Sequence, residues 1–223
     1  MKPLPLVAFL LLAMNATSAS AQTAAVRAGG PEVDLGIVWT RGGSYGSANA
    51  NLTTPAGTPQ PLFSVATDLG PEIALDARFA VRVAGRLRVE VSGTWGRADV
   101  RSHITGDFEG AAPATATDRL TVYTVQGSGI WSFRIRGKLQ PFVRAGAGWM
   151  RELTSDQALA GDGRIANAGV GVKYWWFERA RGGLKRLGVR AETRAVGRFG
   201  GLELGTKDRL IAPAVSVNAI IGF

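Results

Sequence analysis

The sequence of 223 residues contains no cysteine and a single histidine. Without cysteine there can be no disulfide framework, no thiol nucleophile and no cysteine-ligated metal site. One histidine cannot supply a multi-histidine metal centre, so we expect neither a bound metal nor a cofactor. Charged residues make up 19% of the chain and hydrophobic residues 46%, a balance that favours one folded domain over extended disorder.

Long hydrophobic runs are also missing, apart from a short one near the amino end. Lys2 precedes an apolar run from Leu4 to Met14, and Ala19-Ser20-Ala21 supplies the small residues of a cleavage site. This order is typical of a secretory signal peptide, because the run is too short to span a bilayer stably. We therefore predict a signal peptide over 1–21, a short segment over 22–30 and one domain over 31–223. Export makes nucleic acid an implausible partner for the net charge of +9.

The remaining sequence alternates apolar and polar residues and has no run long enough for a transmembrane helix. Such a period of two is typical of β-strands. It predicts eight strands, over 33–39, 73–83, 87–95, 121–133, 139–149, 166–176, 187–199 and 211–223. The connections over 84–86 and 134–138 are short, whereas those over 41–72 and 97–120 are long. The pattern predicts an all-β, antiparallel up-and-down barrel with long loops at one end.

Charged residues lie on only one face of these predicted strands. The apolar face carries none, and the opposite face carries Asp34, Asp76, Arg78, Arg82, Arg88, Glu90, Arg144, Lys173, Arg190, Glu192, Arg194 and Arg198. An arginine or lysine that faces lipid near the bilayer centre costs about 2–4 kcal/mol, whereas opposite charges can pair inside a narrow barrel. A soluble barrel would have the reverse arrangement, with apolar side chains inside. We therefore predict a transmembrane barrel with the charged face toward the lumen.

Aromatic residues mark both ends of the apolar face. They are Trp39, Trp95, Trp149 and Phe199 at one end and Phe133, Trp176 and Phe223 at the other. Tryptophan and other aromatic side chains favour the interface between membrane and water. The sequence thus predicts two aromatic girdles, one at each membrane boundary.

With these features the chain resembles the small outer-membrane β-barrels of Gram-negative bacteria, in particular the opacity-protein and OmpA-barrel-like members. Two motifs add to the resemblance, Gly146-Ala147-Gly148-Trp149 and the alternating stretch over 215–223 that closes with Phe223. The resemblance covers about residues 31–223 and implies a location in the bacterial outer membrane, in contact with its lipids. In that group a terminal aromatic residue is read by the outer-membrane assembly machinery, a role that the resemblance gives to Phe223. It implies an architecture more than an activity.

An eight-stranded barrel has an interior just wide enough for its own side chains. We therefore predict a lumen plugged by an ionic network, in a monomeric protein with a structural or surface-interaction role. The charged face has four acids and eight bases, and this excess leaves open a narrow channel for small solutes or anions. The loop over 41–71 could bind a surface partner, but no residue in it indicates the ligand.

Enzymatic activity is the third alternative. Lipid A deacylases share this scaffold, and they need a serine and a histidine paired on the lipid-facing rim. Ser102 and His103 are adjacent residues within the predicted 97–120 loop, which does not provide that pairing. We therefore predict no enzymatic activity.

Overall fold

The computed structural model describes residues 30–53, 59–106, 110–133, 138–155, 159–179, 183–202 and 209–223. The predicted signal peptide over 1–21 and most of the segment over 22–30 lie outside the described residues. Within the described ranges there is no helix that could serve as a membrane span. The strands are β1 (Glu32–Thr40), β2 (Gly43–Thr53), β3 (Pro59–Leu69), β4 (Glu72–Ala84), β5 (Leu87–Thr105), β6 (Ala114–Ser132), β7 (Leu139–Thr154), β8 (Ala160–Glu178), β9 (Arg186–Gly200) and β10 (Arg209–Gly222).

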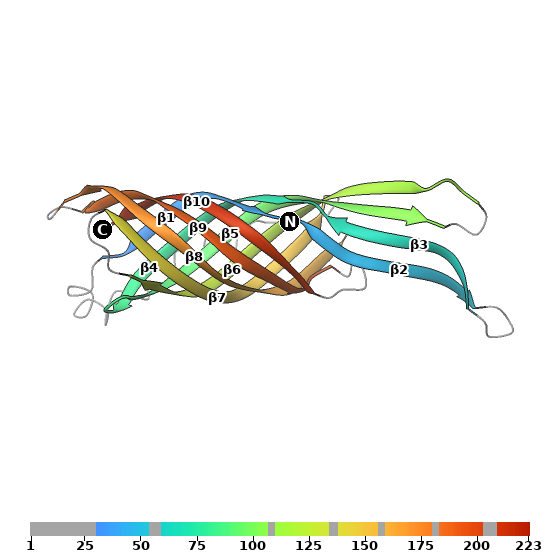
Figure 1. Cartoon of the computed structure of the whole chain (residues 1–223), viewed down its shortest axis with the longest axis horizontal. Helices are drawn as coiled ribbons and strands as arrows, with labels where there is room; N and C mark the ends of the chain where they lie inside the picture. Colours follow the sequence, from blue (N-terminus) through green and yellow to red (C-terminus); the bar gives the residue numbers. More distant parts are fainter. Residues whose placement is uncertain are drawn as a thin grey trace, which may run out of the picture.

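Eight of these strands form a closed ring (Figure 1). The hydrogen-bonded order is β5-β4-β1-β10-β9-β8-β7-β6, and pairing between β5 and β6 closes the ring. Each pairing around the ring is antiparallel. The predicted eight-stranded antiparallel barrel is therefore confirmed.

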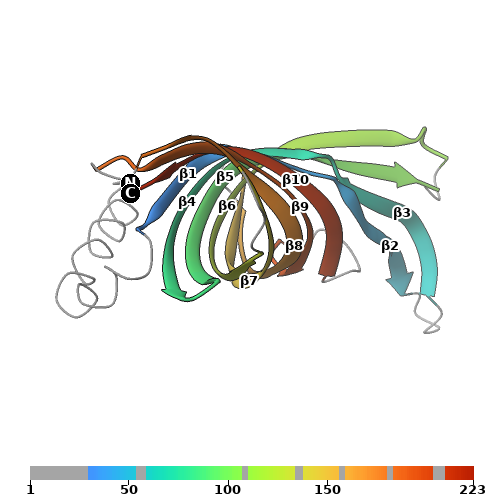
Figure 2. The same cartoon turned by 60° about the vertical axis from the view of Figure 1, so that its left-hand side comes forward.

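The two ends of the ring differ. At one end, here called the turn end, a tight turn joins β4 to β5 at Gly85, whose φ of 47° lies in the region that favours glycine. Phe223 is also at this end, where its backbone amide donates a hydrogen bond of 3.0 Å to the carbonyl of Pro31. At the opposite end, here called the extension end, strands project well beyond the ring (Figures 1 and 2).

The prediction of long loops over 41–72 and 97–120 is wrong, because most of both segments is strand. β2 and β3 form a hairpin, and β3 pairs with β5 from Ser64↔Thr105 to Leu69↔Val100. β5 and β6 continue to pair as far as Ile104↔Ala114. We call β2, β3, residues 97–105 of β5 and residues 114–120 of β6 the extension.

Alternation fails as a signal in the outer part of the extension because both faces meet water there. Consecutive residues over 47–49 and 114–119 are exposed, whereas residues at the base of the extension, such as Leu69 and Val100, are buried. Serine, threonine and asparagine can then occupy both faces, and no apolar period develops. Backbone hydrogen bonds that continue the ladder of the barrel hold these strands together instead.

Within the ring the two faces of each strand differ sharply. On β4, for example, Asp76 and Arg78 are buried, whereas Ile73 and Leu75 are 64% and 54% exposed. The outward face is apolar up to the aromatic residues and changes beyond them. On β5, Trp95 is followed on the same face by exposed Arg97 and Asp99. This change marks the extension-end limit of an apolar band that suits the hydrocarbon of a membrane.

Candidate functional site

The interior of the barrel holds a network of charged side chains. Of the twelve residues predicted for it, eleven are buried, and each of these makes an ion pair. They project from six different strands, so the ring brings together residues that are more than a hundred positions apart in the chain. The strand alternation places each of them inward, because every second side chain faces the lumen.

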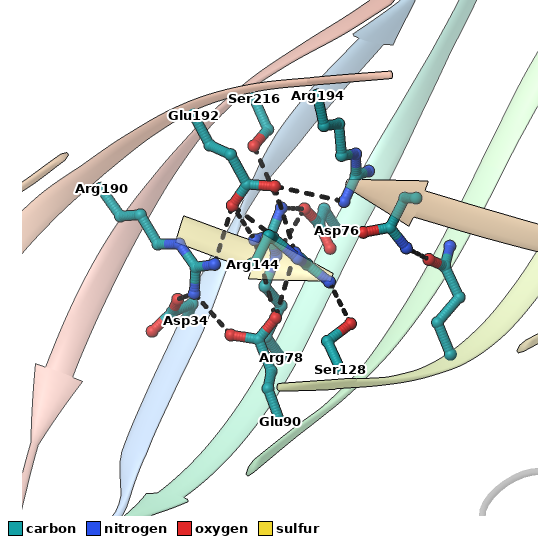
Figure 3. A network of polar contacts seen from close by, with 12 residues as sticks. Asp34, Asp76, Arg78, Glu90, Ser128, Arg144, Arg190, Glu192, Arg194 and Ser216 are labelled. Atoms are coloured by element: carbon teal, nitrogen blue, oxygen red, sulfur yellow. Dashed lines mark hydrogen bonds and ion pairs between the residues drawn. The ribbon is translucent and has the colours of Figure 1, made fainter. Parts of the chain in front are cut away.

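Glu192 of β9 is the most connected member of the central part of the network (Figure 3). Its Oε2 accepts hydrogen bonds from Nη1 of Arg78 at 2.8 Å and Nη2 of Arg190 at 2.7 Å. Its Oε1 lies 3.2 Å from Nη1 of Arg144 and 3.7 Å from Nη1 of Arg194. One carboxylate thus forms ion pairs with four arginines at once.

Glu90, Asp34 and Asp76 complete this central part. Arg190 donates from Nη1 to Glu90 at 2.5 Å and to Asp34 at 2.9 Å. Glu90 also lies 3.1 Å from Nη1 of Arg144, and Asp76 pairs with Arg78. Hydroxyl groups accept two further hydrogen bonds: Ser216 from Arg78 at 3.0 Å and Ser128 from Arg144 at 2.5 Å. Such bridging by charged and hydroxyl groups is what a buried ionic cluster needs to remain stable.

Toward the turn end, the network is centred on Glu32. This carboxylate accepts from Lys173 and lies 2.9 Å from Nη2 of Arg88. The cations of this region also pack over a ring: Lys173 and Arg190 lie 5.7 Å and 4.5 Å from the centre of the Phe142 ring. Cation–π contacts of this kind add attraction in a desolvated setting.

Toward the extension end, Arg198 pairs with Glu72 and lies 3.6 Å from Glu152. Glu152 also accepts a hydrogen bond of 3.1 Å from the backbone amide of Leu202. Burial raises the pKa of nearby Tyr45 to about 12, and the Glu152 carboxylate acts in the same direction. The Tyr45 hydroxyl therefore stays protonated at physiological pH.

An apolar layer fills the lumen around this last group of charges. Its buried members are Val38, Tyr45, Leu69, Ala74, Ala98, Val100, Leu120, Val122, Met150, Ile165, Val196, Leu210 and Ala214. Tyr45 and Leu69 come from the hairpin, so the base of the extension helps to close the barrel. Below this layer, Gln126 bridges to Asn167 at 2.5 Å, and Thr94 contacts Thr124 at 2.7 Å.

The predicted excess of bases over acids is wrong for the buried set. Three inward acids were missed: Glu32, Glu72 and Glu152. Among the described residues, seven acids and seven bases are buried: Glu32, Asp34, Glu72, Asp76, Glu90, Glu152 and Glu192 with Arg78, Arg88, Arg144, Lys173, Arg190, Arg194 and Arg198. Each of these three acids lies an even number of positions from the inward-facing residues of its strand, so its side chain faces the lumen. Each also lies just outside the apolar residues from which its strand was predicted.

Arg82 is the predicted network member that does not join the network. It is only half-buried, and its guanidinium makes no ion pair with any residue in the described ranges. The reason is its position at the end of β4, next to a register shift between Arg82 and Ala84, where the lumen opens at the turn end.

The predicted girdle residues all lie on the outward face, with 41–46% of their surface exposed. Trp39, Trp95, Trp149 and Phe199 lie toward the extension end, and Phe133 and Trp176 lie toward the turn end. Phe223 is also exposed. The role of these rings at the membrane boundaries, and of Phe223 in assembly, stays a prediction.

Ser102 and His103 lie in the extension, not in a loop. As consecutive residues of β5 they point to opposite faces of the sheet. Nδ1 of His103 is 2.8 Å from the hydroxyl of Thr115 on β6. The histidine therefore has a structural partner, and the neighbouring serine faces away from it. Among the described residues, no group of three or more histidine or acidic side chains is arranged to hold a metal ion.

The family model for the outer membrane protein beta-barrel domain matches residues 7–194, well over half of the chain. The chain belongs to this family. As a member of the outer membrane β-barrel family, it is a protein of the bacterial outer membrane, with a barrel whose lumen is occupied by a buried ionic network.

Solved structures of other outer-membrane barrels have the same fold. Neisserial surface protein A (NspA) is 14% identical, with a TM-score of 0.56 over 88% of this chain and 99% of that chain. OprG from Pseudomonas aeruginosa is 11% identical, with a TM-score of 0.53 over 88% of this chain and 96% of that chain. At such identities the likeness concerns the fold alone. Among curated protein sequences, none matches this member of the family.

Proposed function

We propose that the protein is a closed, non-conducting and non-enzymatic barrel that holds the extension outside the cell as a surface for interaction. The balance of seven buried acids and seven buried bases is the observation that carries this proposal. With equal numbers of buried acids and bases, the interior between the two ends of the barrel has no net charge to draw ions of one sign through it. The apolar layer at the extension end adds a second barrier, because an ion that enters it loses its hydration.

The two alternatives, a narrow anion channel and a lipid A deacylase, have less support. A narrow anion channel was favoured by an excess of inward bases, and the buried residues do not have that excess. Lipid A deacylation needs a paired serine and histidine, whereas Ser102 and His103 lie on opposite faces of β5. A monomer is in keeping with the closed ring, since closure leaves the barrel without a free strand edge.

The closed lumen predicts that the refolded protein gives no steady single-channel openings in a planar bilayer. The recording should use a porin as positive control for insertion, and the slower mobility of the boiled sample on gels should verify that the barrel is folded. The Arg144→Glu variant provides the decisive comparison, because Arg144 lies in the central ionic network. Steady anion-selective openings that this variant abolishes would contradict the closed-lumen proposal.

Display of the extension predicts labelling from outside the cell. The chain has no cysteine, so single cysteines can be introduced at two exposed positions, Asn49→Cys in the extension and Lys185→Cys at the turn end. We expect a membrane-impermeant maleimide to label the Asn49→Cys variant on intact cells. The Lys185→Cys variant should react only after the outer membrane is permeabilised. Equal labelling of both variants on intact cells, or the reverse order, would refute the proposed orientation.

A further inference from the structure

A cavity of about 430 Å³ lies at the turn end of the barrel. Four arginines line it, contributed by β4, the turn after β4, β5 and β9: Arg82, Arg86, Arg88 and Arg186. Ser132 and Gln140 add uncharged polar groups from β6 and β7, and no carboxylate of the described residues lines the cavity. Barrel closure thus gathers basic residues from separate strands around one space.

Among the described residues, bases outnumber acids around this cavity. The buried acids and bases of the interior are equal in number, and Arg82, Arg86 and Arg186 are additional to that set. The acids nearby are already engaged: Glu32 binds Lys173 and Arg88, and Glu178 lies 3.8 Å from Arg186 at a solvent-exposed position. Like charges held close together repel one another unless an anion is placed between them.

Two buried side chains at the cavity have polar atoms that make no hydrogen bond with any described residue. Arg88 is 3% exposed, and its Nη2 lies 2.9 Å from Glu32. No described residue accepts from its Nε or Nη1, and the hydroxyl of Ser132, which is 4% exposed, also has no partner there. Of the buried polar groups without partners, these two are the ones that line this cavity. Since unsatisfied buried donors are costly, they indicate a ligand rich in acceptor oxygens.

We propose that the cavity binds a phosphate group. The planar guanidinium fork matches the oxygens of phosphate or carboxylate in pairs. Arg82, Arg88 and Arg186 line the cavity from three different strands. The free oxygens of a phosphate, three in a monoester and two in a diester, are arranged tetrahedrally and can accept from cations on different sides, whereas the two oxygens of a carboxylate lie in one plane. The volume leaves room for an organic group attached to the phosphate. The ligand is therefore a phosphate ester, either in solution or in the headgroup of an anionic phospholipid.

Binding should be measured with both sources. For the soluble source, glycerol 3-phosphate is titrated by calorimetry into the protein in uncharged detergent, at constant ionic strength. For the lipid source, the protein in phosphatidylcholine nanodiscs that contain phosphatidylglycerol is analysed by native mass spectrometry for retained phosphatidylglycerol. The test variant is Arg82→Gln/Arg186→Gln, which leaves the Arg88–Glu32 pair intact. The control, Arg179→Gln/Lys185→Gln, removes the same charge from exposed positions at the turn end that do not line the cavity.

We expect the wild-type protein to bind at least one probe, and the Arg82→Gln/Arg186→Gln variant to bind it about 10-fold or more weakly. Affinity of the control should equal that of wild type. Ser132→Ala should weaken binding without a change of charge. Binding of glycerol 3-phosphate alone would identify a soluble ligand, whereas selective retention of phosphatidylglycerol would identify the lipid headgroup. Binding of neither probe, or equal loss in the test and control variants, would overturn the proposal.

Discussion

The Glu192→Gln variant is expected to lower the free energy of unfolding by about 3–5 kcal/mol. Glutamine has nearly the same shape, so the change removes charge with little change in packing. The four arginines around Glu192 would then share only the remaining carboxylates. Uncompensated charge in a buried cluster is strongly destabilising, because neither water nor a counterion replaces the lost partner. Urea titration followed by fluorescence of the six tryptophans measures the difference.

Glu178→Gln is the matched control for this experiment. Glu178 also pairs with an arginine, at 3.8 Å from Nε of Arg186, but the pair is exposed at the turn end. Exposed ion pairs are screened by solvent, and we expect a loss below about 1 kcal/mol. Equal losses in the two variants would mean that the buried network does not stabilise the barrel through charge.

A second large loss of folding free energy is expected for an arginine introduced on the outer face of β7. The Ala145→Arg variant places a guanidinium on the apolar band, midway between the strand start at Leu139 and the ring of Trp149. We expect folding into bilayers to be weakened by about 2–4 kcal/mol, as for arginine near a bilayer midplane. Equilibrium folding into phospholipid vesicles is the appropriate measurement, because detergent does not impose a fixed depth.

Leu153→Arg provides the comparison on the same face of the same strand. Leu153 pairs with Thr121 and Ala160, and it lies beyond Trp149, next to the exposed Arg151. Near the interface the cost of arginine falls to about 0–1 kcal/mol. If Ala145→Arg and Leu153→Arg had the same effect, the outward face over 139–149 would not be in contact with lipid.

The barrel strands could be predicted from sequence because their residues alternately face lipid, which requires apolar side chains, and the lumen, where charged side chains can pair. The extension could not be predicted in this way. Its strands are held together by backbone pairing, and water on both faces of its outer part removes the apolar period there. Within the barrel, the alternation of apolar residues also ends before the strands do. Glu72 precedes the first apolar residue of β4, and Glu152 follows Trp149 on β7, so alternation does not assign either of them to the network.

The turn-end cavity could not be predicted from sequence for a different reason. Arg82, Arg88, Ser132 and Arg186 come from four strands, and only closure of the ring places them around one space. Periodicity assigns a side chain to a face, but it does not say at which height along the lumen the side chain lies. Periodicity therefore places Arg82 with the buried cations, although it lies where the lumen opens.

The hairpin of β2 and β3 leaves and rejoins the barrel at nearly the same point. β1 pairs directly with β4 from Glu32↔Ala80 to Thr40↔Glu72, and a Cβ placed on Gly42 would lie only 2.6 Å from the carbonyl carbon of Gly70. The segment between these glycines is thus an insertion whose two attachment points are already in contact. The part of this hairpin beyond the Asn49↔Ser64 pair, where pairing with β5 ends, can therefore diverge in length and sequence among descendants, or be exchanged for a foreign epitope, without a new register in the barrel wall.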